Sequence, residues 1–175
     1  ATYENIQRVG LPDWSEDDQT LARGLQRELG QEERGLTDSI GDLSGPVDLD
    51  RSLGGGSDDI GDVSWNMPTV TLRYPANMPG GPGHNWANGI AMATPIAHKG
   101  SLAGAKVQTL TLLDLLLRPE LVDEAWSYFN DVQGEEQEYI PFISDTDQPA
   151  TFLNEEIMQR YRPLMEPYYY DATRF

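Results

Sequence analysis

The stretch TVTLRYPANMPGGPGHNWANGIAMATPIAHKGSLAGAKVQTLTLLDLLL, residues 69–117, carries the clearest secondary-structure signals of the chain. Its first part, residues 69–74, alternates apolar and polar side chains and is rich in β-branched residues, which predicts a short strand. Residues 75–95 contain proline and glycine at many positions and predict a loop. Residues 101–117 place apolar side chains at helical spacing, so they predict a long helix with a wide apolar face.

Upstream of this stretch, residues 2–29 have the spacing of apolar side chains that is typical of a helix. Within them, Ser15 has the chemistry of an N-cap and precedes a run of acidic residues that suits the first turn of a helix. Gly30 has the chemistry of a C-cap. Residues 31–56 are poor in large apolar side chains and rich in Gly, Asp and Ser, which predicts a loop.

Downstream, Pro119 predicts the first turn of a further helix, because proline is favoured at this position and its ring fixes a helical φ. We expect this helix to run to about Val132 and to be followed by an acidic turn at residues 135–138. The tail is rich in aromatic residues, with a predicted helix at residues 154–162. Tyrosines in a terminal extension favour packing onto a neighbouring surface.

The charge balance excludes two classes of function. The 175 residues include 29 acids and 12 bases, a formal net charge of −17. A protein that binds nucleic acid or an anionic membrane needs a basic face, so neither partner is expected. The chain has no cysteine, which excludes disulfides, thiolate metal sites and a cysteine nucleophile. No apolar run approaches the length of a membrane helix and no signal peptide is recognisable, so we expect a cytoplasmic protein.

Three aspartates, Asp58, Asp59 and Asp62, lie beside several glycines in one short segment. Clustered acids next to glycine can bind a hard cation, can form hydrogen bonds around a site, or can belong to a plain Gly/Asp turn. The spacing does not fit a calcium-binding loop, and no lysine follows the glycines as it would in a phosphate-binding loop.

The chain has two histidines, His84 and His98, in or beside the loop that leads to the long helix. Histidine is the commonest neutral metal ligand and acid/base residue, and an exposed loop histidine without a special role is equally compatible with the pattern. A catalytic zinc site takes three protein ligands, so one histidine does not make such a site alone. No Gly-x-Ser-x-Gly motif supports a serine hydrolase.

Several motifs, taken in order, resemble the C-terminal part of the aminobenzoyl-glutamate utilisation protein B group. This group belongs to the dinuclear metallo-amidohydrolases, which also include aminoacylases, hippurate hydrolases and glutamate carboxypeptidases. The similarity extends over nearly the whole chain. Its motifs are GSDDIGDVSW at 56–65, PT at 68–69, PGHNW at 82–86, AHKG at 97–100, NEEIM at 154–158, RYRPLM at 160–165 and YYYD at 168–171.

The resemblance implies an α/β fold, the C-terminal half of a sheet-and-helix catalytic domain that is incomplete on its own. Residues 1–30 would be the helix that returns from an absent lid domain. Residues 31–135 would form the C-terminal half of the catalytic domain, and residues 136–175 an extension that packs on it. The apolar face of the helix at residues 101–117 would lie on the sheet.

The resemblance also implies site residues. The family's last metal ligand is a histidine that matches His84. Asp58 and Asp59, which lie in the family's Gly-Ser-Glu-Asp-like motif, would hydrogen-bond around the site or bind substrate, as would Asp62 and His98. The family's other metal ligands and its catalytic glutamate have no counterpart here, so we expect no catalytic residue in this chain.

The implied function is that of a metal-dependent amidohydrolase acting on N-acyl or aminobenzoyl amino acid substrates. Two divalent metal ions, zinc or manganese, would activate a water molecule in the complete enzyme. The chain would be a cleaved product, a split subunit or a fragment, and would need a partner chain carrying the N-terminal half. The complete enzyme would be a homodimer. The alternative is a non-catalytic structural or assembly subunit derived from such an enzyme.

Overall fold

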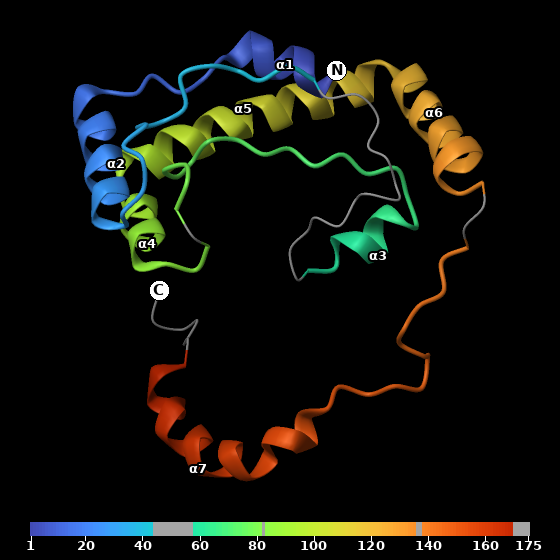
Figure 1. Cartoon of the computed structure of the whole chain (residues 1–175). Helices are drawn as coiled ribbons and strands as arrows, with labels where there is room; N and C mark the ends of the chain where they lie inside the picture. The colour runs from blue at the N-terminus through green and yellow to red at the C-terminus, as the bar shows by residue number, and fades with distance from the viewer. Residues whose placement is uncertain (44–57, 82, 136–137, 170–175) are drawn as a thin grey trace. The chain divides into compact units, whose positions relative to one another are not determined.

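The computed structural model describes residues 1–43, 58–81, 83–135 and 138–169. The chain divides into two compact units, Ala1–Glu138 and Tyr139–Phe175. Within the described residues of both units, all regular secondary structure is helical (Figure 1).

The first unit contains most of the helices. They are α1 (Thr2–Val9), α2 (Glu16–Glu28), α3 (Ile60–Ser64), α4 (Trp86–Met92), α5 (Pro95–Leu117) and α6 (Pro119–Tyr128), which continues into a π-helical turn, Phe129–Gln133. The second unit contains a 3₁₀ turn (Thr151–Asn154), α7 (Glu155–Met165) and a further 3₁₀ turn (Glu166–Tyr168).

The predicted α/β fold is wrong for the described part of the chain, which has no strand and no sheet. Residues 69–74 run as an irregular segment, although their sequence has the pattern of a strand. A strand needs a neighbouring backbone to receive its hydrogen bonds. No backbone hydrogen bond joins residues 69–74 to another described segment, which explains why the pattern alone did not produce a strand.

The predicted start and end of the second helix are confirmed. The Ser15 hydroxyl accepts a hydrogen bond from the Asp18 backbone N–H at 3.2 Å, and the Asp18 carboxylate accepts one from the Ser15 N–H at 2.9 Å. This reciprocal capping box satisfies two backbone donors at the start of α2. At the other end, Gly30 has a φ of 66°, a left-handed conformation that glycine adopts without strain and that stops the helix.

The core of the first unit is small and is built where α2, α4 and the start of α5 meet. Trp14, Leu21 and Leu29 cover it from the side. Its buried residues are Ala22, Leu25, Leu36, Met78, Ala87, Ala91 and Ile96. The helix α4 contributes to this core although it lies in a segment predicted to be a loop, because Asn85 caps its N-terminus: the Asn85 side chain accepts a hydrogen bond from the Ala87 N–H.

The long helix α5 begins earlier than predicted, at Pro95, and packs on a different face from the one expected. Its buried side chains are small or lie near its N-terminal half, and α1 packs alongside it (Figure 1). Leu113, by contrast, is 47% exposed. The expectation that the leucines lie on a sheet is therefore wrong, because the described residues provide no sheet to cover them. The buried residues of α5 are Ile96, Ala97, Gly100, Ala103 and Val107.

Two buried amides connect distant segments of the first unit. The Gln26 side-chain NH₂ donates to the carbonyls of Gly35 and Pro79 at 3.2 and 3.0 Å, and its oxygen accepts from the Gly35 N–H at 2.8 Å. The Asn5 side chain donates to the Asp114 carboxylate at 2.7 Å, which joins α1 to α5. Because both amides are buried and hydrogen-bonded, they specify which segments pack together.

A partly buried polar contact joins α2 to α5. The Lys99 ammonium donates to the Asp18 carboxylate at 2.6 Å and to the Asp13 carbonyl at 2.8 Å. Burial acts to raise the pKa of Asp18, but hydrogen bonds from Lys99 and Ser15 outweigh it, and the pKa lies below its ordinary value of 3.8. The charged form of Asp18 is thus favoured by folding.

Replacing Asp18 with asparagine should destabilise the chain by about 1–2 kcal/mol at neutral pH, because Lys99 loses its charged partner. The lowered pKa of the folded state means that this stabilisation is present above pH 4 and is lost as the pH falls below 3.8. Urea denaturation between about pH 2 and pH 7 measures it. The Asp18→Asn variant should lose less stability in acid than the parent chain, and an unchanged acid dependence would contradict this assignment.

In the second unit no described residue is buried, although α7 confirms the helix predicted at residues 154–162. Acidic Glu155 and Glu156 occupy its first turn and Arg162 its last, which suits the helix dipole. No helix among the described residues of either unit has both the length and the apolar character to cross a membrane.

Candidate functional site

His84, the predicted metal ligand, lies in the turn that immediately precedes α4. It is exposed and has a φ of 54°, a left-handed conformation that histidine adopts more often than most residues. The neighbouring Asn85 is tied to α4 by the capping hydrogen bond from Ala87 at 2.9 Å. The backbone on one side of His84 is therefore anchored, and its imidazole is exposed to solvent.

His98, the other histidine, lies in the first turns of α5 and is also exposed. The next residue, Lys99, turns inward and pairs with Asp18. The helix therefore presents the His98 imidazole outward while the adjacent positive charge is held by α2.

The three aspartates lie around the short helix α3. The Asp58 carboxylate accepts a hydrogen bond from the Ile60 N–H at 3.1 Å, and Asp59 is the N-cap residue of the helix. Asp62 lies inside the helix, and all three are exposed. The glycines and the serine that precede them, residues 54–57, lie outside the described residues. The Asp58 contact is that of an Asx turn, which is the plainest of the three interpretations of this segment.

The structure does not bring these residues together into a metal site. In the described ranges, no group of three or more His, Asp or Glu side chains is arranged so that it could hold a metal ion. The donor set of the described residues therefore does not fit a complete site, which takes at least three protein ligands.

A recess that the sequence did not predict lies in the first unit. It has a volume of about 690 Å³ and is formed by α1, residues 37–43 and residues 70–75. Its wall is mainly apolar, and Tyr74 closes one side by donating a hydrogen bond to the Gly10 carbonyl. Burial raises the pKa of Tyr74, which keeps its hydroxyl protonated as a donor. The three segments are distant in sequence, so no local pattern could have indicated this recess.

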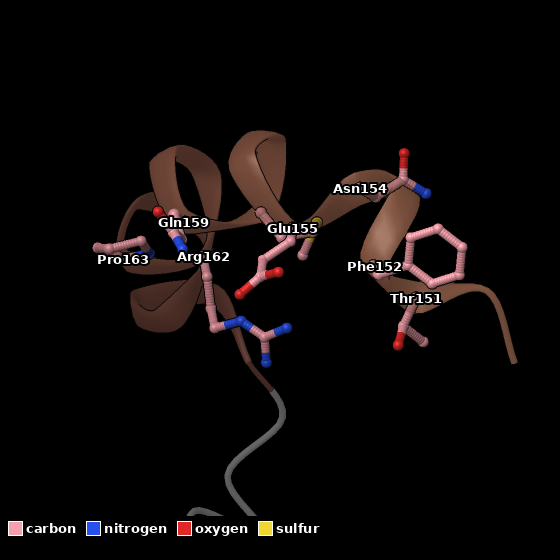
Figure 2. Close-up of a pocket in the computed structure, with 8 residues that line it drawn as sticks. Thr151, Phe152, Asn154, Glu155, Gln159, Arg162 and Pro163 are labelled. Atoms are coloured by element: carbon pink, nitrogen blue, oxygen red, sulfur yellow. The ribbon is translucent and has the colours of Figure 1, made fainter. Parts of the chain in front are cut away.

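A second recess, of about 670 Å³, lies in the second unit between the 3₁₀ turn at Thr151–Asn154 and α7 (Figure 2). In Figure 2 the side chains of Glu155 and Arg162 extend toward the same side of the helix. All the residues that line it are exposed or half-buried. Its charged side chains, Glu155 and Arg162, are therefore solvated, and the recess contains no buried acid or base. Neither recess contains a histidine.

Comparison with known proteins supports a relationship to the group indicated by the motifs. The chain is similar to a p-aminobenzoyl-glutamate hydrolase subunit of Escherichia coli (strain K12), with 27% identity over 145 residues. The similar region covers 71% of this chain and 30% of that protein, so the chain spans less than a third of the length of this relative. No protein-family model and no solved structure matches the chain.

Proposed function

We propose that this chain is a portion of a metal-dependent amidohydrolase that cleaves the amide bond of N-acyl or aminobenzoyl amino acid substrates. The observation that carries this proposal is the similarity, over 71% of the chain, to a hydrolase of p-aminobenzoyl-glutamate. That relative is named as a subunit, which supports a partner chain for this one as well. The partner would carry the N-terminal half of the catalytic domain, and the complete enzyme would be a homodimer.

In this proposal His84 is a ligand to one of two divalent metal ions, zinc or manganese. Its exposed position before α4 supports the role, because a neutral imidazole needs an accessible nitrogen to bind a metal. A metal pair supplies Lewis-acid polarisation of the amide carbonyl and a more acidic water. Asp58, Asp59, Asp62 and His98 would orient metal ligands by hydrogen bonds or would contact the substrate.

A second candidate function is that of a non-catalytic structural or assembly subunit. One observation favours it: among the described residues that line the two recesses, no acidic or basic side chain is buried. The two candidates differ in one measurable property, which is amide hydrolysis by the assembled protein.

We expect the complex that contains this chain to hydrolyse p-aminobenzoyl-glutamate. The chain would be tagged in its source cells, purified with its companion chain and assayed with zinc or manganese and after chelation. Activity should disappear on chelation and return with metal, because the metal pair supplies the Lewis acid. Hydrolysis that persists without metal would contradict metal dependence, and a complete lack of hydrolysis would favour the assembly subunit.

The purified 175-residue chain serves as the control in this experiment. It should be inactive and should bind zinc more weakly than about 1 μM, since one imidazole is only a fraction of a closed coordination sphere. Tighter zinc binding by the isolated chain, measured by isothermal titration calorimetry, would show that the chain forms a metal site without its partner.

A further inference from the structure

The C-terminal half of α5 exposes leucines that the core of the first unit does not use. Together with Leu102 they form what we call the leucine face: Leu102, Leu112, Leu113, Leu116 and Leu117 are 60%, 51%, 47%, 79% and 77% exposed. Single exposed apolar residues are common on proteins, but five on one helix form a patch that needs a physical explanation.

These leucines share one side of the helix. Leu102, Leu112 and Leu116, with Ala105 and Thr109 between them, follow each other at spacings of three and four residues. At 3.6 residues per turn such positions form a continuous stripe, which is the pattern of a helix that packs against another apolar surface.

The opposite side of α5 is already occupied. Its buried residues, among them Gly100, Ala103 and Val107, lie on the side that packs against the rest of the unit, and α1 is in contact with this helix (Figure 1). α5 therefore has one face for its own unit and a second face whose leucines, in the C-terminal half of the helix, are left exposed by the described segments of the first unit.

The size and charge of the leucine face suit a protein partner. The five side chains present roughly 550 Å² of surface, about two thirds of the ~800 Å² that one side of a standard interface buries. The charged residue on this side of α5 is Lys106, whereas Asp114 is held by Asn5 on the packed side. Acids are thus absent from this stripe in a chain with a net charge of −17.

We propose that the leucine face is the docking surface for the polypeptide that completes the hydrolase. This inference depends on the function proposed above. The similar region is 30% of the E. coli relative, so about 70% of that protein lies outside the alignment, and a polypeptide of that length is large enough to supply the other side of such an interface. A second copy of this chain is a poorer occupant, because two chains of −17 each repel one another.

The test uses the tagged chain purified from its source cells, with bound polypeptides identified by native mass spectrometry and peptide sequencing. The variant Leu112→Gln with Leu116→Gln places amides on the leucine face. The matched control is Leu153→Gln with Leu164→Gln, which changes two leucines of the second unit that are 71% and 64% exposed. Circular dichroism of each variant checks that helicity is unchanged.

The parent chain should carry a polypeptide whose sequence matches the part of the E. coli relative outside the aligned region. The amount of this polypeptide recovered with the leucine-face variant should fall at least tenfold, whereas the control variant should retain the amount found with the parent chain. Equal retention by both variants, capture of a second copy alone, or a monomer without any partner would overturn the proposal. If the complex forms by this surface but hydrolyses no amide, the docking surface stands and the proposed enzymatic function fails.

Discussion

Gly100→Ala is expected to be the most damaging single-methyl substitution in the first unit. A Cβ at Gly100 would lie 2.1 Å from the Pro75 carbonyl oxygen and 2.5 Å from the Ala76 Cα. Both neighbours are backbone atoms, so no side-chain rotation relieves the overlap. The added methyl must push residues 75–76 away from α5, and we expect a loss of about 3 kcal/mol or more in the free energy of unfolding.

Gly24→Ala in α2 is the matched control for this prediction. A Cβ at Gly24 meets nothing within 4 Å, and alanine is favoured over glycine inside a helix by about 1 kcal/mol. Urea denaturation of both variants should therefore move the transition midpoint in opposite directions. A Gly100→Ala variant as stable as the parent chain would show that residues 75–76 do not pack on α5.

In the metal-dependent hydrolase proposed above, His84→Ala should remove one bound metal ion and lower the turnover number by orders of magnitude. The reason is that a metal site missing one of its few protein ligands binds its ion weakly and polarises the substrate poorly. Metal content per complex, measured by mass spectrometry of the metal, and kcat for p-aminobenzoyl-glutamate give the two readouts.

Two further variants separate ligand loss from other effects. His84→Asn removes the imidazole and retains a residue that tolerates the φ of 54° at this position, so it should lose metal like His84→Ala without added backbone strain. His98→Ala should keep full metal content, because His98 lies within α5 next to Lys99, whose positive charge opposes the binding of a metal cation at this position. Full metal occupancy in His84→Asn, or loss only in His98→Ala, would show that His84 is not the ligand.

Both ends of α2 and the start of α6 could be predicted because their causes are local in sequence. Ser15 and Asp18 are three residues apart and cap α2 with each other's side chains. Gly30 ends the same helix, and Pro119 begins α6 because its fixed φ suits a first turn. Such contacts form within a few residues of each other and depend little on the rest of the fold.

The site residues were harder to predict, since their roles depend on neighbours from outside their own segment. His84 was singled out by its motif, and the structure adds that it is exposed in a turn anchored by Asn85. The recess closed by Tyr74 was missed, because three separate segments form it. No group of three or more metal-binding side chains gathers among the described residues, around His84 or elsewhere.

The sequence by itself therefore determined where α2 begins and ends, where α6 begins, the strong negative charge, and the motifs that resemble the aminobenzoyl-glutamate utilisation protein B group. Only the tertiary structure decided that residues 69–74 form no strand and that α5 packs through Ala103 and Val107 rather than through its leucines. The physical reason is the same in both cases. A strand needs a neighbouring strand to receive its backbone hydrogen bonds, and the apolar face of a helix needs another apolar surface to pack against. Only the folded chain shows whether that neighbour is present.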